Sequence, residues 1–434
     1  MLGWEFPPAF TGGLGVACYG IVKALHHSIA IHLVIPQSVP HVELDGVQIT
    51  GLNQLDSLVA TEELSDFDYR YLVNTFHRLP VGLTSYPRSM EKRGMRSSTL
   101  QESFELREII DDPSATWADV AKLVFSGDEI YGYDISYRTH LYARLVDQIS
   151  SKIDFDIVHA HDWPTFEAAL AVKQSTGKPL VLHIHSLETD RAGENIRNAI
   201  YDLEKYAMIN ADQIIAVSQY TKNQIVRLYQ IDPDKINVVH NGSEPALASS
   251  FKKKVKEKWI VFVGRITSQK GPNFLLQTAE KLVKVCPEAR FVVAGDGDMF
   301  PHLITEVAYK KLGKYFIFTG FLSKERINDL LAVADIYFMP SISEPFGLSA
   351  LEAAQQNVPS VISNRSGAAE VLINTLQADF WDTDKFADYL NALIHYPALK
   401  KEIKAKLNED IKSLTWENAA KNILKVYDQA QRLN

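Results

Sequence analysis

The chain has 434 residues, of which 46% are hydrophobic and 23% charged, and its formal net charge is −8. This length exceeds one average core and predicts two domains. The negative charge argues against nonspecific nucleic-acid binding and mildly against docking on an anionic membrane. With only Cys18 and Cys286, and apolar runs no longer than strands, we expect no disulfide framework, signal peptide or membrane span, and a cytoplasmic location.

Strand-like apolar runs alternate with helical patterns over most of the chain, which predicts an α/β fold with parallel sheets. In the first half, the expected strands are 29–35, 155–160, 180–185, 213–217 and 236–239. In the second half, they are 259–263, 289–294, 316–319, 336–339 and 360–362. We therefore expect two doubly wound, Rossmann-like domains that face a central cleft. Ligands are expected to bind beyond the carboxyl ends of the strands.

The predicted domains are 1–245 and 259–415, joined by a polar linker at 246–258. Within the first domain, 52–150 lacks regular alternation and is interpreted as an insertion. The last segment, 416–434, is predicted to be a helix. The chain offers almost no strand before Glu5, so either the first strand is short or the true start lies upstream.

Two carboxylates, Glu344 and Glu352, stand eight positions apart around a loop marked by Pro345 and Gly347. A helix predicted from near Gly347 would direct free N–H groups and its positive dipole end toward Glu344. If the segment were helical throughout, the carboxylates would be roughly 12 Å apart. An anion bound between them suits a nucleotide sugar. The alternative is an ordinary strand-to-helix turn with a solvated glutamate.

Two cations, Arg265 and Lys270, lie in a loop bounded by Gly264 and Gly271. Arginine offers a bidentate fork for phosphate oxygens and lysine a compact charge. Together they would neutralise a departing diphosphate, where charge develops in the transition state. An exposed basic loop is the alternative interpretation.

A glycine cluster, Gly12, Gly13 and Gly15, opens the helix predicted at 16–25. Glycines allow a backbone to approach a phosphate closely at a helix N-terminus. The spacing differs from the dinucleotide fingerprint, and the acidic residue of that fingerprint is missing. A tight turn is the alternative.

Histidines recur at two neighbouring strand ends, as His159 and His161 and then as His183 and His185. We interpret His159 as structural and His161, beside the cleft, as functional. Zinc binding is the alternative, but neutral core or cleft-lining histidines are favoured and no metal is expected. The segment 295–298 resembles a carboxylate pair for a metal, yet it has no third ligand nearby and is predicted to be a turn.

Five motifs occur in one order along the chain. They are Glu5 with Gly12–Gly15, His161-Asp162-Trp163, Asn241-Gly242, Gly264-Arg265 with Lys270-Gly271, and Glu344 with Glu352. In this order and spacing the chain resembles the retaining nucleotide-sugar glycosyltransferases of the glycogen synthase type, which have the GT-B fold. The resemblance covers nearly the whole chain and weakens across 52–150.

The resemblance implies roles for individual residues. Arg265 and Lys270, beside Gly264, would bind the donor diphosphate, Glu344 the hydroxyls of the donor sugar, and Glu352 the ribose. His161 would hydrogen-bond the donor sugar, and the backbone of Phe346, Gly347 and Leu348 would hold sugar and phosphate. The backbone of Gly12, Gly13 and Gly15 would close on the diphosphate. Glu5, Asp162, Trp163, His185 and Asn241 would line the cleft or the acceptor side.

The implied reaction needs no cofactor or metal, because the acceptor hydroxyl attacks from the leaving-group face and the departing phosphate oxygen acts as base. Lys270 and Glu344 are expected to be exposed in the cleft, and the last helix is expected to cross back to the first domain. One position departs from the pattern: Phe10, after Ala9, stands where bacterial starch and glycogen synthases commonly carry lysine. That difference argues against a preference for ADP-glucose.

The leading hypothesis is transfer of glucose from UDP- or ADP-glucose to an α-glucan, with no nucleic-acid partner. The first alternative is the same chemistry with a glycolipid, exopolysaccharide or small-glycoside acceptor. It is supported by residues 183–191, which resemble the broader family of sucrose- and trehalose-type enzymes. The second alternative, from another class, is a catalytically degenerate protein that binds a sugar nucleotide.

Overall fold

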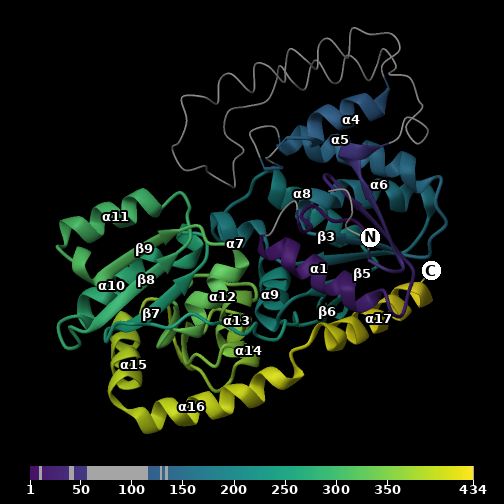
Figure 1. Ribbon diagram of the computed structural model, residues 1–434. Coiled ribbons are helices and arrows are strands. Elements are labelled where there is room, and N and C mark those ends of the chain that lie inside the picture. Colours follow the sequence, from purple (N-terminus) through teal and green to yellow (C-terminus); the bar gives the residue numbers. More distant parts are fainter. Residues whose placement is uncertain (9–11, 39–43, 56–115, 128–129, 132–134, 434) are drawn as a thin grey trace.

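The computed structural model describes residues 1–8, 12–38, 44–55, 116–127, 130–131 and 135–433. Within them, helices alternate with parallel strands in two units, each built on one sheet (Figure 1). The predicted α/β class is therefore confirmed. Ala9 and Phe10, where the sequence departs from the resembled family, lie outside the described residues, as does most of the predicted insertion.

All strands of the first sheet are parallel. They are β1 (Ile31–Ile35), β2 (Val47–Gly51), β3 (Val158–His161), β4 (Leu180–Ile184), β5 (Gln213–Ala216) and β6 (Ile236–Val238). Leu2 joins the pair β2-β1 to the set β3-β4-β5-β6, because it forms parallel bridges with both Val34 and Ala160. The opening strand is thus present but short. Counting it as the first strand, the sheet has the doubly wound order 3-2-1-4-5-6, with β6 added at the edge as a seventh strand.

The second sheet has the same order, β9-β8-β7-β10-β11-β12, and is also parallel. Its strands are β7 (Lys258–Val263), β8 (Ala289–Ala294), β9 (Phe316–Gly320), β10 (Ile336–Met339), β11 (Ser360–Ser363) and β12 (Leu376–Ala378). The order reverses between β7 and β10, and in the first sheet between Leu2 and β3. Ligands bind at such reversal points, beyond the carboxyl ends of the strands.

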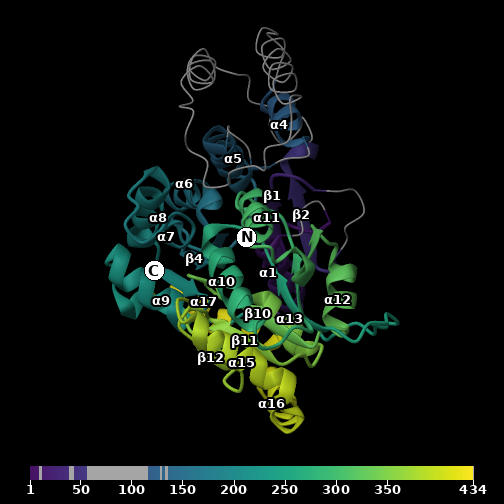
Figure 2. The ribbon, with the colours of Figure 1, turned by 90° about the vertical axis from the view of Figure 1, so that its left-hand side faces the viewer.

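Helices cover the two sheets. Those of the first unit are α1 (Gly13–Leu25), α4 (Trp117–Phe125), α5 (Ile135–Ser150), α6 (Phe166–Thr176), α7 (Glu188–Ala192), α8 (Ala199–Asn210) and α9 (Gln219–Gln224). Those of the second are α10 (Pro272–Leu282), α11 (Phe300–Tyr309), α12 (Lys324–Ala332), α13 (Leu348–Gln355), α14 (Ala368–Val371), α15 (Thr383–His395) and α16 (Pro397–Asp410). Both views place α4 and α5 at the opposite end of the molecule from α16 (Figures 1 and 2). None of the described helices is long and apolar enough to cross a membrane.

Burial explains which strands the sequence predicts. The central strands β4 and β10 are buried at every position, so each appears in the sequence as a continuous apolar run. The predicted set omits β2 and β12, which are edge strands and only partly buried. Edge strands need fewer apolar residues, and their sequence signal is therefore weaker.

The last helix, α17 (Trp416–Leu433), crosses from the second unit to the first and packs on α1 (Figure 1). This confirms the predicted crossing. Ile423 and Val426 of α17 share one apolar cluster with Ile21 of α1. The approach is close at Gly20, where an added Cβ would lie 2.2 Å from the ring of Trp416.

Candidate active site

Most of the predicted site residues lie at the reversal points of the two sheets, and the two units touch there, whereas Asn241 follows the edge strand β6. In the first unit, α1 follows the opening strand and the loop 162–165 follows β3. In the second unit, the loops 264–271 and 340–347 follow β7 and β10. Helix α7 of the first unit contacts the short 3₁₀ turn Ser268–Lys270 of the second. The motifs, far apart in sequence, are therefore brought to one region.

An ion pair joins two of these loops, because Nζ of Lys270 donates a hydrogen bond to Oε2 of Glu344. The hydroxyl of Ser341 donates to the same oxygen at 3.3 Å. Glu344 is only 5% exposed, so the expectation that it lies open in the cleft is wrong. Burial of this carboxylate is tolerated because the lysine compensates its charge.

The loop of Lys270 is fixed by a close backbone approach at its end. Gly271 has a φ of +69°, and a Cβ there would lie 2.2 Å from the carbonyl oxygen of Pro340. Any other residue would therefore push the cation loop away from the loop that carries Glu344. The glycine is needed for the pairing of Lys270 with Glu344.

The loop of Arg265 is supported by the turn that follows β8. Ile266 N–H donates to the carbonyl oxygen of Asp296 at 2.8 Å. The Asp296 carboxylate accepts a hydrogen bond from the N–H of Gly297 at 2.7 Å, and the N–H of Phe300 closes a turn on the oxygen of Gly297 at 3.0 Å. The turn predicted at 295–298 is therefore present but begins two residues later. Arg265 itself is exposed at the end of this supported loop.

Helix α13 begins one residue after Gly347, whose φ is +100°, close to the predicted start. Two hydrogen bonds of 3.0 Å brace the preceding loop, from Glu344 N–H to the oxygen of Arg365 and from Gly367 N–H to the oxygen of Glu344. Among the described residues, no acceptor is bonded to the N–H groups of Phe346, Gly347 and Leu348. These groups and the helix dipole provide a site for an anion.

Glu352 lies in the second turn of α13 and faces a different hollow. This cavity, of about 60 Å³, is also lined by Lys324, Gly242 and Trp416. Burial raises the pKa of the Glu352 carboxyl, and Lys324 partly opposes the shift. The ribose-binding role of Glu352 stays a prediction.

A carboxylate of the protein itself occupies the N-terminus of α1. Oε2 of Glu5 accepts a hydrogen bond from the N–H of Gly15 at 3.2 Å, and Tyr131 O–H donates to Oε1 at 2.7 Å. A Cβ at Gly12 would lie 2.3 Å from Oε2. The glycines therefore admit the Glu5 carboxylate, and one N–H expected to face a phosphate is already used. Contact of Gly12 and Gly13 with a diphosphate stays a prediction.

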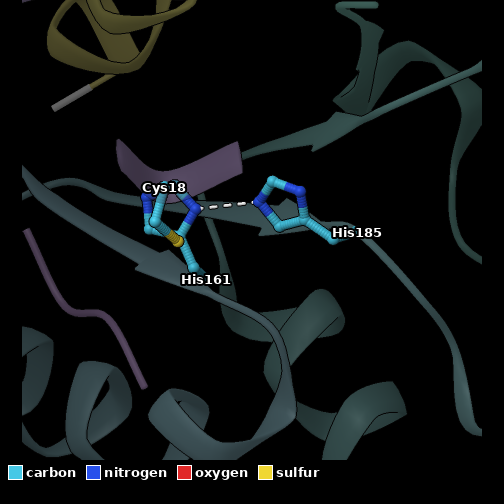
Figure 3. Close-up of side chains that lie close together, drawn as sticks. All are labelled: Cys18, His161 and His185. Carbon is cyan, nitrogen blue, oxygen red and sulfur yellow. Dashed lines mark hydrogen bonds between the residues drawn. The ribbon is translucent and has the colours of Figure 1, made fainter. Parts of the chain in front are cut away.

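The four histidines form two hydrogen-bonded pairs that stack on each other. His159 Nε2 lies 3.2 Å from His183 Nδ1, and His161 Nδ1 lies 2.9 Å from His185 Nε2 (Figure 3). Ring centroids of His159 and His161 are 4.4 Å apart, and those of His183 and His185 are 4.2 Å apart. The other nitrogen of His159 lies 2.6 Å from the hydroxyl of Tyr427 on α17. The structural interpretation of His159 is thus confirmed.

His161 differs from His159 because its Nε2 is buried and bonded to no described residue. The whole side chain is buried, so Nε2 is unpartnered but closed off from solvent. Burial lowers the pKa of all four histidines, to about 3 for His185, so the stack is neutral at neutral pH. A hydrogen bond from His161 to the donor sugar stays a prediction.

The thiol of Cys18 lies within 4.8 Å of ring nitrogens of His161 and His185, close enough for a shared metal ion (Figure 3). Two observations weigh against that use. The facing nitrogens of His161 and His185 already bond to each other. Burial, with Asp162 and Glu5 nearby, raises the pKa of the thiol and disfavours the thiolate that a metal needs. A site without metal stays our prediction.

Three of the predicted acceptor-side residues, Asp162, Trp163 and Asn241, are buried. Asp162, whose φ is +59°, accepts hydrogen bonds from the N–H groups of His185 at 2.7 Å and Ser186 at 3.2 Å. Burial raises the pKa of its carboxyl to about 7. Trp163 and Asn241 are 4% and 5% exposed. Asp162 therefore braces the loop after β4, and a direct contact of these residues with the acceptor stays a prediction.

Helix α7 carries charged residues that the motif comparison does not single out. Arg191 is buried, with Nε bonded to Glu188 at 3.0 Å and Nη2 to Glu204 at 2.9 Å. Its neighbour Asp190 accepts a hydrogen bond from the hydroxyl of Ser343 at 2.5 Å. The sequence signal that could have revealed these residues is the run of acidic and basic side chains at 188–191, shortly after the end of β4.

Two family descriptions match the chain. "Glycosyltransferase Family 4" matches residues 89–247, and "Glycosyl transferases group 1" matches 243–412. Together they match the second unit and the part of the first unit that follows β2, while α1, β1, β2 and α17 lie outside both matches. Their junction falls at the segment between β6 and β7, which contains neither helix nor strand.

Similar proteins come from several sources. An uncharacterized glycosyltransferase of Methanocaldococcus jannaschii is 25% identical over 100% of this chain and 98% of its own. A glycogen synthase of Mycobacterium tuberculosis is 27% identical over 64% of this chain and 69% of its own. A D-inositol 3-phosphate glycosyltransferase of Rhodococcus jostii is 27% identical over 64% and 67%. The solved structure of Anabaena HepE with UDP and glucose superposes with a TM-score of 0.64, at 15% identity, over 98% of both chains.

Proposed function

Because this chain is a GT-B glycosyltransferase of the glycogen synthase-like type, we propose that it moves glucose from UDP- or ADP-glucose to an α-glucan, with retention and without a metal. The observation that carries the proposal is the Lys270–Glu344 pair. It lies at the reversal point of the second sheet, beside the unbonded N–H groups of residues 346–348. A cation, a carboxylate and a helix N-terminus are what a sugar diphosphate requires.

In the proposed donor complex, the diphosphate lies near Lys270, the exposed Arg265 and the N-terminus of α13. The two side chains provide positive charge where the leaving nucleoside diphosphate gains negative charge. Glu344 accepts hydrogen bonds from the hydroxyls of the sugar. The HepE structure, which has the same fold, holds UDP and glucose, and this supports the choice of a UDP-sugar among the donors to be tested.

In the proposed reaction, the bond between the anomeric carbon and the phosphate oxygen breaks, and a bond to the acceptor oxygen forms on the same face. The proton of the acceptor hydroxyl passes to the departing phosphate oxygen. The protein then needs to supply charge stabilisation and orientation rather than a nucleophile. Arg265 and Lys270 supply the first, while Glu344 and Nε2 of His161 supply the second.

The similarity to a glycogen synthase supports an α-glucan as acceptor. A second candidate acceptor is a phosphorylated polyol, because a D-inositol 3-phosphate glycosyltransferase is equally similar at 27% identity. Donor chemistry is the same in both cases. We also propose a cytoplasmic location, which is supported by the free thiols of Cys18 and Cys286.

The test is a grid of donors and acceptors in which released nucleoside diphosphate is measured. UDP-, ADP- and GDP-glucose are each combined with glycogen, maltooligosaccharides, inositol phosphate and a lipid extract. Turnover with glycogen or maltooligosaccharides supports the leading proposal, and turnover with inositol phosphate alone supports the second. A Lys270→Met variant provides the inactive control. Turnover with the lipid extract alone contradicts both proposals. The absence of turnover with every acceptor contradicts them as well.

A further inference from the structure

The residues on both sides of Glu344 are hydrogen-bonded to the other unit. On one side, the hydroxyl of Ser343 donates to Oδ1 of Asp190 in α7 at 2.5 Å. On the other side, the hydroxyl of Ser218, before α9, donates to the carbonyl oxygen of Pro345 at 2.6 Å. Glu344 is thus held between two fixed points supplied by the first unit.

Both points of attachment are buried and have supports of their own. Asp190, Ser218 and Ser343 are 6%, 0% and 9% exposed. Oδ2 of Asp190 accepts the N–H of Leu187 at 2.9 Å, which fixes the carboxylate on α7. Tyr220 adds a second bond of the first unit to the Ser343 hydroxyl, at 2.8 Å. Buried hydrogen bonds of this kind hold their groups in one orientation.

The second unit secures helix α9 in return. The carboxylate of Glu370 accepts the N–H groups of Gln219 at 2.8 Å and Tyr220 at 2.6 Å, at the N-terminus of α9. The same carboxylate lies 3.0 Å from Nε2 of His240. The first turn of α9, directly after Ser218, is therefore bonded to the second unit, the same unit to which Ser218 donates its hydrogen bond.

We infer that Asp190 and Ser218 are positioning residues, which hold the Glu344 carboxylate in its working orientation through Ser343 and Pro345 while the two units are in contact. This inference rests on the proposed role of Glu344 toward the donor sugar. A loop released at either point would let the carboxylate move, and misplacement by about 1 Å can cost about 100-fold in rate. Neither positioning residue needs to touch the donor.

The test compares three variants, of which two remove a contact between the units and one keeps it. Ser343→Ala removes the hydroxyl bonded to Asp190, and Ser343→Thr restores a hydroxyl. Glu194→Gln is the matched control, because Glu194 forms an ion pair with the side chain of Arg365 at 2.6 Å across the same boundary. The backbone oxygen of Arg365 that accepts the N–H of Glu344 takes no part in this ion pair. Hydrogen exchange of the peptide covering residues 341–351 is measured first, on the full chain without any donor.

We expect exchange in this peptide to be about 10-fold faster in Ser343→Ala and close to wild type in Ser343→Thr and Glu194→Gln. With the donor found in the grid above, kcat of Ser343→Ala should fall by about 10- to 100-fold, while KM for the donor changes by less than about 3-fold. A role limited to holding the units together would affect Glu194→Gln equally.

Unchanged exchange in Ser343→Ala, or an equal effect in Glu194→Gln, would overturn the inference whichever donor the enzyme uses. Equal kcat in Ser343→Ala and wild type would also overturn it. Failure of the proposed function is a separate result, seen when the wild-type chain releases no nucleotide from UDP- or ADP-glucose.

Discussion

The carbonyl oxygen of Gly264 lies 1.9 Å from the position that a Cβ at Gly295 would occupy. The two glycines follow the adjacent strands β7 and β8, and their φ angles are +151° and +148°. The backbone of the Arg265 loop therefore packs directly on the next loop, with no room for a side chain. This contact sets the path of the chain that carries the proposed phosphate ligands.

The first prediction follows from this contact. Gly295→Ala should destabilise the protein by about 2 kcal/mol or more, since the new methyl group meets a backbone atom and the φ is unfavourable for alanine. Urea unfolding gives the free energy. Gly313→Ala is the control, because no atom lies within 4 Å of its added Cβ. Equal unfolding free energies for the two variants would show that the contact is not as close as described.

The second prediction concerns the Lys270–Glu344 pair. Lys270→Met and Glu344→Gln should each lower kcat/KM at least about 100-fold, through lost charge stabilisation and lost sugar orientation. Because the pair is largely buried, Lys270→Met should also lower the free energy of unfolding by about 2 kcal/mol. A lysine exposed to solvent could be replaced without such a loss. Steady-state kinetics and urea unfolding check both effects.

The control for this pair is Lys406→Met, which removes an ion pair with Glu402 on the surface of α16, where the two side chains are 51% and 64% exposed. Exposed pairs contribute little, so activity and stability should stay close to wild type. Wild-type turnover in Lys270→Met would contradict the proposed site.

The third prediction is a pH dependence of stability. Burial keeps the folded-state pKa of the four stacked histidines below the usual 6.5, so only the unfolded chain takes up their protons as the pH falls through 6.5. Burial also raises the pKa of four carboxyls, to about 7 for Asp162 and Glu204 and above the usual value for Asp190 and Glu352, and these carboxyls act in the opposite direction. His32, whose pKa burial lowers to about 4, adds a fifth histidine to the four of the stack. Five histidines outweigh four carboxyls, so the free energy of unfolding should fall on acidification from about pH 6.5 to 5.

Urea unfolding at several pH values measures this slope. Replacing one member of the stack, as in His185→Gln, should reduce the slope by about 1.4 kcal/mol per pH unit. The exposed His302 provides the control, since His302→Gln should leave the slope unchanged. A slope that His185→Gln does not alter would mean that the histidine is not kept neutral by the fold.

The fourth prediction concerns the crossing helix. Trp416→Ala should cost about 3–5 kcal/mol, because the buried ring fills the space above Gly20 between α17 and α1. Trp381→Ala is the matched control, since that ring is 56% exposed and its loss should cost far less. Thermal unfolding measures the stability of both variants. A loss of stability in Trp416→Ala no larger than in Trp381→Ala would exclude tight packing of α17 on α1.

Much of the fold was predictable because each central strand is buried on both faces and therefore apolar along its length. β4 and β10 are examples, and α17 starts at the predicted residue. The proposed site was predictable where residue type and spacing carry the chemistry, as with Lys270 and Glu344. The role of Asp190 was not, because its partner Ser343 lies 153 positions away and no local pattern links them.

The sequence by itself determined the α/β class, the family resemblance and the loops that hold the cations and carboxylates, since these depend on local periodicity and on residue type. Only the tertiary structure decided that Glu344 is buried against Lys270, that Glu5 occupies the N-terminus of α1, and that four histidines form one neutral stack. Each of these depends on the distance between two side chains that are far apart in the sequence. That distance is set by the order of the strands in each sheet and by the contact between the two units.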